Sequence, residues 1–265
     1  MTDARHHRQR ILAEVGEAGQ RRLERASVAI VGVGGLGSPV ALYLAAAGVG
    51  HLGLVDDQRV ELSNLNRQIL FEECDVGRPK VEAAAGRLRL LDPALRLDER
   101  QENVRASNVA GLLAAYDLVV DATDAFETRF LLNDAAVLLH KPLVHGAVLR
   151  WGGQVTTVLP GGPCLRCLFR EPPDPDEVPT CEEAGIIGAA TGVIGSVQAE
   201  EALKVLLGVG EPLSGRIFQY DGLRGETRIT SFPSDPQCPV CSSHSRITDL
   251  SRYADQVSPR GHVLT

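Results

Sequence analysis

The amino-acid sequence predicts an α/β protein with a mostly parallel sheet that is continued by antiparallel strands and carries a structural metal site. The parallel part is predicted because short β-branched runs alternate with helical segments from residue 27 to about residue 150. The antiparallel part is predicted because this alternation stops after Trp151, and two strand-like segments then flank the turn residues Asp221-Gly222. Two C-x-x-C pairs predict the metal site.

The elements of the first half follow one another in strict alternation. Residues 27–31 form a buried strand, and the glycines after it lead into an Ala-rich helix over 39–47, with Ser38 as its N-cap and Pro39 as its first residue. Further strands are expected at 52–55, 95–99, 118–121 and 143–147, and further helices at 79–91, 107–114 and 127–139. This order is typical of a parallel sheet covered by helices on both faces.

The elements of the second half follow a different pattern. Residues 154–159 alternate like a strand, 171–179 are rich in proline and acids like an exposed loop, and 186–207 form a long helix. The segments 216–220 and 226–231 are expected to pair as a hairpin.

Composition and charge exclude several classes of protein. With 265 residues, 44% of them hydrophobic, the chain can build one large α/β domain with small attachments. Its net charge of −7 and the lack of a basic stripe argue against nucleic-acid binding. No apolar leader is visible, and the longest apolar stretch, 40–55, is interrupted by glycines and a histidine. We therefore expect a soluble cytoplasmic protein that does not enter membranes.

A glycine-rich turn follows the first strand and opens directly into a helix. Backbone without side chains admits a phosphate closely, and the helix N-terminus supplies free N–H groups. The candidate nucleotide contacts in this turn are Gly34, Gly35, Leu36 and Gly37. Asp56 closes the second strand, at the position where a carboxylate accepts ribose hydroxyls. This Rossmann-like pattern alone would suit NAD as well as ATP.

Charged residues farther along the chain favour a triphosphate over NAD. Arg67 and Lys80 lie in segments that can face the glycine turn, and Asp124 follows the strand at 118–121. Two cations suit the larger charge of ATP, and an acid beside phosphates can hold Mg²⁺. Each residue alone has the simpler interpretation of a surface charge, so the prediction depends on their shared place at the carboxyl ends of the strands.

The motifs together resemble those of the ThiF/MoeB/HesA family, the bacterial relatives of ubiquitin-activating enzymes. The resemblance covers about residues 5–242 and includes G-x-G-G-L-G, L-S-N-L-N-R-Q, G-x-P-K, D-A-T-D, both C-x-x-C pairs and a T-C pair before G-x-x-G-A-A-T-G-V-I-G-S. It implies transfer of AMP from ATP to the C-terminal glycine carboxylate of a ubiquitin-like sulfur-carrier protein that ends in Gly-Gly.

The resemblance also implies roles for single residues. Asp56 would contact the ribose, Asp124 would organise Mg²⁺, and the phosphate contacts would be Asn64, Arg67 and Lys80.

The short basic stretch near the N-terminus has two interpretations. On composition alone it is a solvated arm. By resemblance, Arg8 reaches the phosphates of the neighbouring subunit in a homodimer.

One residue departs from the family pattern. Ala125 stands where the family usually has Asn after D-x-T-D, so the polar contact of that side chain is missing.

Two C-x-x-C pairs about 70 residues apart predict a structural zinc site. Cys164 and Cys167 form one pair, and Cys238 and Cys241 form the other. Four thiolates fill a tetrahedral Zn²⁺ and leave no position open for a substrate. The alternative is four thiols without a metal. A thioredoxin-like redox role is disfavoured by the context of both pairs.

Cys181 stands apart from both pairs, beside the proline-rich loop and before a helix. A helix N-terminus activates a thiol, whereas Glu182 and Glu183 act against this. Chemistry alone leaves a nucleophile and an unreactive loop cysteine equally open. In relatives the matching cysteine can bond covalently to the carrier or to sulfur, so Cys181 is the candidate nucleophile by resemblance.

The expected organisation is an N-terminal helical arm (1–26), a ThiF-type adenylation domain (27–246) and a tail (247–265). A nucleotide-binding half (27–150) and an antiparallel, zinc-binding half (151–246) divide the domain. No rhodanese-like domain is appended, so sulfur is expected from a separate donor protein. The pathway stays open between thiamine, molybdopterin and tRNA thiolation. The alternatives are an NAD-dependent oxidoreductase, a relative that adenylates a small molecule or tRNA base, and a non-catalytic binding module.

Overall fold

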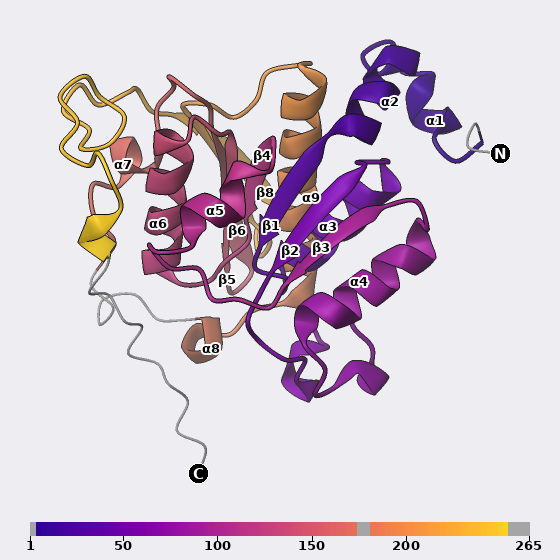
Figure 1. Cartoon of the computed structure of the whole chain (residues 1–265). Coiled ribbons are helices and arrows are strands. Elements are labelled where there is room, and N and C mark those ends of the chain that lie inside the picture. The colour runs from indigo at the N-terminus through magenta and orange to yellow at the C-terminus, as the bar shows by residue number, and fades with distance from the viewer. Residues whose placement is uncertain (1–3, 174–180, 254–265) are drawn as a thin grey trace.

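A single twisted sheet runs through the computed structural model, which describes residues 4–173 and 181–253 (Figure 1). Its strand order is β3-β2-β1-β4-β5-β6-β7-β8. The parallel strands are β1 (Ser27–Val31), β2 (His51–Val55), β3 (Arg96–Arg100), β4 (Leu118–Asp121) and β5 (Leu143–Leu149). The antiparallel strands are β6 (Gly152–Val158), β7 (Arg216–Asp221) and β8 (Glu226–Ser231). The predicted α/β fold class is therefore confirmed.

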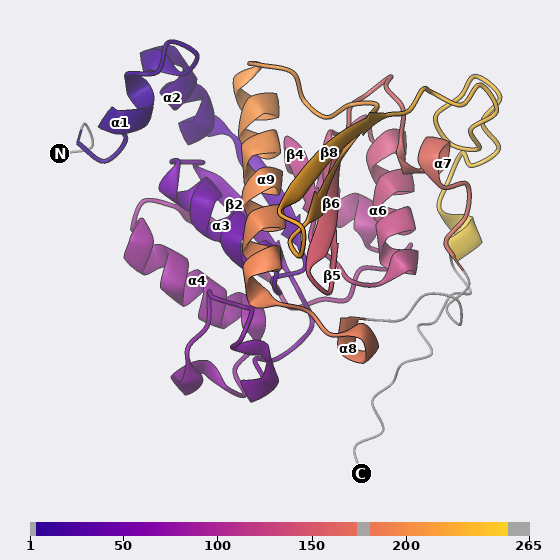
Figure 2. The same cartoon turned by 180° about the vertical axis from the view of Figure 1, so that it is seen from behind.

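Helices cover both faces of the parallel strands (Figures 1 and 2). One face carries α3 (Gly37–Ala46), α4 (Lys80–Leu91) and α9 (Gly188–Leu207). The other face carries α5 (Val109–Ala114) and α6 (Phe126–Leu138). The remaining helices are α1 (His7–Arg10), α2 (Gly16–Arg25), α7 (Leu165–Leu168) and α8 (Cys181–Ala184), with 3-10 turns η1 (Leu62–Asn64), η2 (Glu73–Asp75) and η3 (Ser251–Tyr253).

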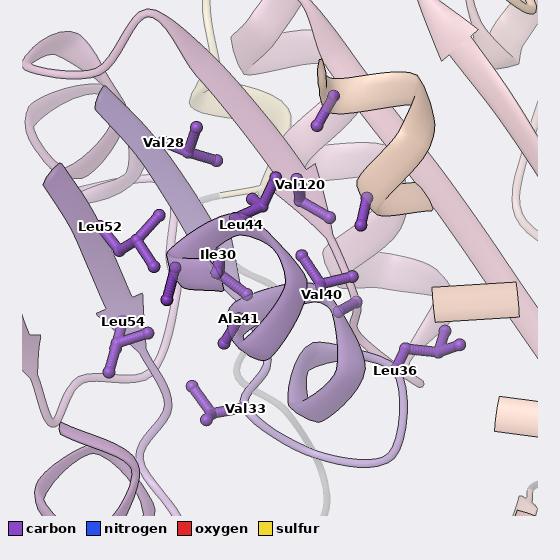
Figure 3. Close-up of a cluster of buried hydrophobic side chains, with 14 of the residues drawn as sticks. Val28, Ile30, Val33, Leu36, Val40, Ala41, Leu44, Leu52, Leu54 and Val120 are labelled. Carbon is purple, nitrogen blue, oxygen red and sulfur yellow. The ribbon is translucent and has the colours of Figure 1, made fainter. Parts of the chain in front are cut away.

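The two faces of β1 enter two separate cores. Val28 and Ile30 belong to the cluster beneath α3, which Figure 3 shows in close-up. Ala29 and Val31 belong to the cluster beneath α5 and α6. A central parallel strand is buried on both sides, which explains its unbroken apolar run. Because β1, β2, β4 and β5 run parallel, their carboxyl ends lie at one edge of the sheet, here called the carboxyl edge.

The start of α3 differs from the prediction. Ser38 is inside the helix, because its N–H already donates to the Gly34 carbonyl oxygen at 2.9 Å, and the residue before the helix is Leu36. The prediction of Ser38 as N-cap was therefore wrong. The glycine turn passes into the helix without an intervening extended residue. The Ser38 hydroxyl is buried and has no hydrogen-bond partner within the described residues.

Residues 247–253, the last described residues of the chain, pack against the core beneath α5 and α6. Ile247 and Tyr253 are both buried there, and the Ile247 N–H donates to the Pro239 carbonyl oxygen at 2.8 Å.

None of the helices within the described ranges combines the length and apolar character needed to cross a membrane.

Candidate nucleotide site and cysteine cluster

At two positions the glycine turn after β1 lies so close to neighbouring backbone that a side chain does not fit. Gly32 has φ +88°, and a Cβ there would lie 2.7 Å from the Ala122 carbonyl oxygen. A Cβ on Gly37 would lie 2.0 Å from the Gly32 carbonyl oxygen. Glycine is therefore required at both positions. The turn directs the N-terminus of α3 to the carboxyl edge, where its free N–H groups favour an anion.

Asp56 directly follows β2 and is hydrogen-bonded to the glycine turn. Its Oδ2 accepts from the Val33 N–H at 2.8 Å, and its Oδ1 accepts from the Gln58 N–H at 2.9 Å. Burial raises the pKa of Asp56, although the charge of Lys80 and the two N–H donors act against that rise. The acid lies at the edge where sequence analysis expected the ribose contact.

Lys80 begins α4 and is almost completely buried, with 3% of its surface exposed. Its Nζ donates to the neutral Gln58 Oε1 at 2.6 Å, and no carboxylate among the described residues forms an ion pair with it. Burying an ammonium group whose hydrogen-bond partner is neutral is costly, and the charge of Asp56 acts on Lys80 only from beyond ion-pair distance. The arrangement therefore favours an anionic ligand at this position.

Arg67 and Asn64 come from the segment between β2 and α4. Asn64 is buried, and its Oδ1 accepts from the Glu61 N–H at 3.2 Å, which caps η1. Arg67 is half-buried, and its Cγ lies 3.6 Å from where a Cβ on Gly35 would be. This contact places Arg67 beside the glycine turn. The side-chain oxygen of Asn64 is thus used within the local turn, a role that the sequence did not reveal.

Gln68 is a residue of this edge that sequence analysis missed. Its side chain is buried, and its Nε2 lies 3.6 Å from where a Cβ on Gly34 would be. Its Oε1 lacks a hydrogen-bond partner within the described part of the chain. The place of Gln68 at the end of the L-S-N-L-N-R-Q motif was the available signal.

Asp124 lies in the loop between β4 and α6 and is exposed. The loop is joined to the glycine-turn strand because the Ala122 N–H donates to the Val31 carbonyl oxygen at 2.9 Å. Ala125 occupies the N-cap of α6, where it makes no side-chain cap. An Asn at this position would satisfy a helix N–H group, so the departure from the family pattern removes a cap.

Arg8 is the predicted site residue that the fold keeps apart from the others. The arm that carries it is attached to the far end of α3, where Gln9 Nε2 donates to the Ala47 carbonyl oxygen at 2.7 Å. The ten residues of α3 span about 15 Å between that attachment and the glycine turn. Figure 1 shows α1 at the opposite end of the sheet from α8. Arg8 therefore lies away from the carboxyl edge of its own chain.

The four cysteines of the C-x-x-C pairs converge, with all sulfurs within 4.8 Å of one another. The Cys164 and Cys238 sulfurs are 3.6 Å apart, and those of Cys167 and Cys241 are 3.4 Å apart. These distances exceed a disulfide bond of about 2.05 Å and approach the roughly 3.8 Å between thiolates on a tetrahedral Zn²⁺. Hydrogen bonding from Cys241 lowers the pKa of Cys164, and the same contact raises that of Cys241. The donor set fits zinc.

A buried charge network, missed by sequence analysis, braces this cluster. Arg166, between the first two cysteines, is 1% exposed and donates from Nε to Asp134 at 2.8 Å. Its Nη2 donates to the Tyr253 hydroxyl oxygen at 2.8 Å, and the Tyr253 hydroxyl donates to Asp134 at 2.6 Å. Although burial acts to lower the pKa of Arg166, the contacts with Asp134 raise it. The network links α6, α7 and η3.

Cys181 begins α8, which contacts β5 near the carboxyl edge. Its side chain, and residues 174–180 of the proline-rich loop, lie outside the described residues. The role predicted for this thiol therefore stays a prediction.

The sheet, the glycine turn and the cysteine cluster together define the class of protein. An open α/β sheet with a glycine turn, an acid and a buried lysine at its carboxyl edge is a nucleotide-binding architecture, here extended by an antiparallel half with a cysteine cluster. The chain belongs to the ThiF family, whose model matches residues 6–240. The family resemblance inferred from the motifs is confirmed.

Curated relatives cover nearly the whole chain. A sulfur carrier protein adenylyltransferase of Thermus thermophilus is 51% identical and covers 94% of both chains. The SAMP-activating enzyme E1 of Haloferax volcanii is 47% identical over 89% of this chain and 88% of its own. The adenylyltransferase and sulfurtransferase MOCS3 of Aedes aegypti is 47% identical, but the chain spans 58% of its length.

Solved structures share the fold at lower sequence identity. Escherichia coli MccB, in a crystal structure with ATP, superimposes with a TM-score of 0.80 at 23% identity over 90% of this chain and 74% of its own. This likeness supports the fold alone.

Proposed function

We propose that the chain is an ATP-dependent adenylyltransferase that activates the C-terminal glycine carboxylate of a ubiquitin-like sulfur-carrier protein. The observation that carries the proposal is the buried Lys80, whose Nζ donates to the neutral side chain of Gln58. The backbone N–H of the same Gln58 donates to Asp56, so the lysine and the acid lie on either side of one residue. An anion is needed there, and the acid beside it suits a ribose. A 51% identical relative is named for this activity.

The reaction follows from the chemistry of the carrier's terminus. A carboxylate oxygen attacks the α-phosphorus of ATP, the P–O bond to the β-phosphate breaks, and pyrophosphate leaves with the electron pair. No general base is required, because the nucleophile is already an anion. The protein supplies orientation and charge, which dominate such steps. Lys80 and Arg67 would neutralise the phosphates, and Asp124 would hold Mg²⁺ on them.

An NAD-dependent oxidoreductase is less well supported. It uses the glycine turn and Asp56, but the pyrophosphate of a dinucleotide carries fewer negative charges than a triphosphate and gives Lys80 and Arg67 less charge to neutralise. Family membership favours adenylylation as well.

Zn²⁺ is proposed as the occupant of the four cysteines. When bound, it would link the chain around residue 240 to the start of α7. Four sulfur ligands leave no coordination position for a reactant, so the metal is assigned to the fold. A separate sulfur donor is expected, and Cys181 stays the candidate residue for covalent sulfur transfer. Cytoplasmic location is part of the same proposal.

The decisive experiment is ATP–pyrophosphate exchange with a panel of purified sulfur carriers that end in Gly-Gly. Exchange should depend on one or more carriers and on Mg²⁺, and it should disappear when the carrier's last glycine is removed. Exchange with none of the carriers would refute the proposal. A change in nicotinamide absorbance with any substrate would instead support the oxidoreductase.

Arg8 is proposed to complete the site of a partner copy in a homodimer, since it lies far from its own carboxyl edge. Mixing Arg8→Ala chains with Asp124→Ala chains tests this. If Arg8 acts in trans, hybrid dimers contain one intact site, and an equal mixture recovers roughly a quarter of wild-type exchange. If Arg8 acted in its own chain, the mixture would recover nothing.

A further inference from the structure

A buried ionisable pair lies beneath the loop that carries Asp124, and the proposed chemistry does not use it. Asp121, the last residue of β4, is 0% exposed, and His145 of β5 is 5% exposed. The His145 Nδ1 and Asp121 Oδ2 are 2.7 Å apart. Charged or polar groups are buried this completely only when their hydrogen bonds are made, so the pair has a definite geometry.

The other oxygen of Asp121 fixes the loop itself. Oδ1 accepts from the Thr123 N–H at 3.0 Å and from the Thr123 hydroxyl at 2.7 Å. One carboxylate thus joins a sheet residue on one side to the residue directly before Asp124 on the other. Because His145 occupies Oδ2, the carboxylate cannot rotate away from Thr123 without losing a buried hydrogen bond.

The next peptide is held from the opposite side. Arg129 of α6 donates to the Thr123 carbonyl oxygen from Nε at 3.2 Å and from Nη2 at 3.0 Å. The Asp121 carbonyl oxygen accepts from Gln198 Nε2 of α9 at 2.7 Å. Gly146 makes room for that amide, since a Cβ on Gly146 would lie 2.3 Å from the Gln198 Cδ. Both ends of the loop are therefore fixed.

Asp124 itself has little to hold it. It is exposed, and the following residue, Ala125, provides no cap for α6. The position of its carboxylate consequently depends on the backbone of residues 122–124. We infer that His145 is a positioning residue that, through Asp121 and Thr123, holds Asp124 where Mg²⁺·ATP is bound. This inference rests on the proposed adenylylation.

The polar groups that interact with this pair come from the loop and from two helices; on the neighbouring strand β6, Thr156 lies opposite His145. The interacting groups are Thr123 of the loop, Arg129 of α6 and Gln198 of α9. Burial acts to raise the pKa of Asp121, but the hydrogen bond and charge of His145, followed by Arg129 and Thr123, lower it overall. The Asp121 carboxylate is thus held in its accepting, ionised form, as the loop geometry requires.

The test compares His145→Leu, which removes the donor, with His145→Asn, whose amide nitrogen occupies the place of Nδ1. Carrier-dependent ATP–pyrophosphate exchange is measured as Mg²⁺ is varied. We expect His145→Leu to reduce the maximal rate about 100-fold, the cost of a misplacement near 1 Å, and to raise the Mg²⁺ concentration for half-maximal exchange. His145→Asn should recover most of both. Unchanged Mg²⁺ dependence in His145→Leu would overturn the inference.

A double variant separates positioning from a merely structural role. Asp124→Asn, which keeps one oxygen ligand, should exchange slowly, and adding His145→Leu should slow it no further, because the two changes act through the same carboxylate. Independent, multiplying effects would contradict the inference. If His145→Leu does not fold, Thr123→Val removes one bond to Asp121 and should slow exchange about threefold to tenfold with the same Mg²⁺ shift. An unaltered Thr123→Val rate would also overturn it.

Exchange by the wild-type chain separates a failure of the positioning role from a failure of the proposed function. Wild-type exchange with unaffected variants refutes the positioning role alone. No wild-type exchange with any Gly-Gly carrier refutes the proposed function and the inference together.

Discussion

The carboxyl edge and the cysteine cluster treat their buried polar groups in opposite ways. At the carboxyl edge, Lys80 has one neutral acceptor, and the oxygens of Gln68 and Ser38 have no partner within the described residues. Beside the cysteines, Arg166 finds acceptors for Nε, Nη1 and Nη2. The first region is incomplete without a ligand, whereas the second is complete once the sulfurs hold a metal. The two regions therefore differ in whether their buried polar groups are already paired within the described residues.

The largest expected effect is loss of the metal from the complete region. Cys238→Ala removes one of four sulfurs, and structural zinc contributes on the order of 10 kcal/mol in small zinc domains. The variant should purify without zinc and unfold at a much lower temperature, because the segment 164–167 loses its link to residues 238–241. Metal analysis and thermal unfolding measure this. If the wild type purified without zinc and Cys238→Ala unfolded at the same temperature as the wild type, the four cysteines would not be a structural metal site.

Next in size is the loss of Asp124, the acid proposed to organise Mg²⁺ in the incomplete region. Asp124→Ala should reduce exchange by at least about 10²–10³-fold, the scale of a lost electrostatic contact in a transition state. Its unfolding temperature should stay near that of wild type, because Asp124 is exposed. Exchange and calorimetry are measured on the same sample. Full exchange in this variant would remove Asp124 from the mechanism.

A smaller effect is expected from opening the complete region. Tyr253→Phe leaves Arg166 Nη2 and Asp134 Oδ2 each without one partner, which should cost about 2 kcal/mol in the free energy of unfolding. Denaturant unfolding measures the loss, and the exchange rate should stay at the wild-type value. Reduced exchange at full stability would show that the two regions are coupled.

The opposite change gives the buried lysine of the carboxyl edge a charged partner within the chain. Gln58→Glu would give Lys80 a carboxylate partner, so less positive charge would be available for the ligand. We expect ATP to bind about tenfold more weakly, or about 1.4 kcal/mol. Gln58→Met is the matched control, since it removes the acceptor without adding charge and should bind ATP at least as well as Gln58→Glu. Tighter binding by Gln58→Glu would contradict the view that Lys80 is reserved for an anion.

The smallest effect is expected at Cys181. Cys181→Ser should leave ATP–pyrophosphate exchange unchanged, because adenylylation needs no thiol. Only transfer of sulfur to the carrier should fail, which mass spectrometry of the carrier terminus would detect. A loss of exchange would show that Cys181 belongs to the nucleotide site.

The alternation of strands and helices was sufficient to predict the sheet, and cysteine spacing was sufficient to predict the cluster. Both depend on local periodicity or on a strongly constrained donor set. The Arg166 network was not predictable, because Asp134 and Tyr253 lie 32 and 87 residues away from Arg166 and no motif links them. Ser38 was misjudged because only the three-dimensional turn shows that the helix begins before it. Gln58 carries no signal in the sequence, since its importance lies in what Lys80 lacks.

The distance along the chain between the cysteine pairs has a consequence for biosynthesis. Cys164 and Cys238 are 74 residues apart. At 5–20 residues per second, a ribosome would need about 4 to 15 seconds between them. A nascent or truncated polypeptide that ends before Cys238 therefore carries every group of the carboxyl edge but only half of the sulfur ligands. If the cysteines hold zinc as proposed, the site can close only after Cys241 is made, and a nonsense mutation between α9 and Cys238 would yield a chain with only two of the four sulfur ligands.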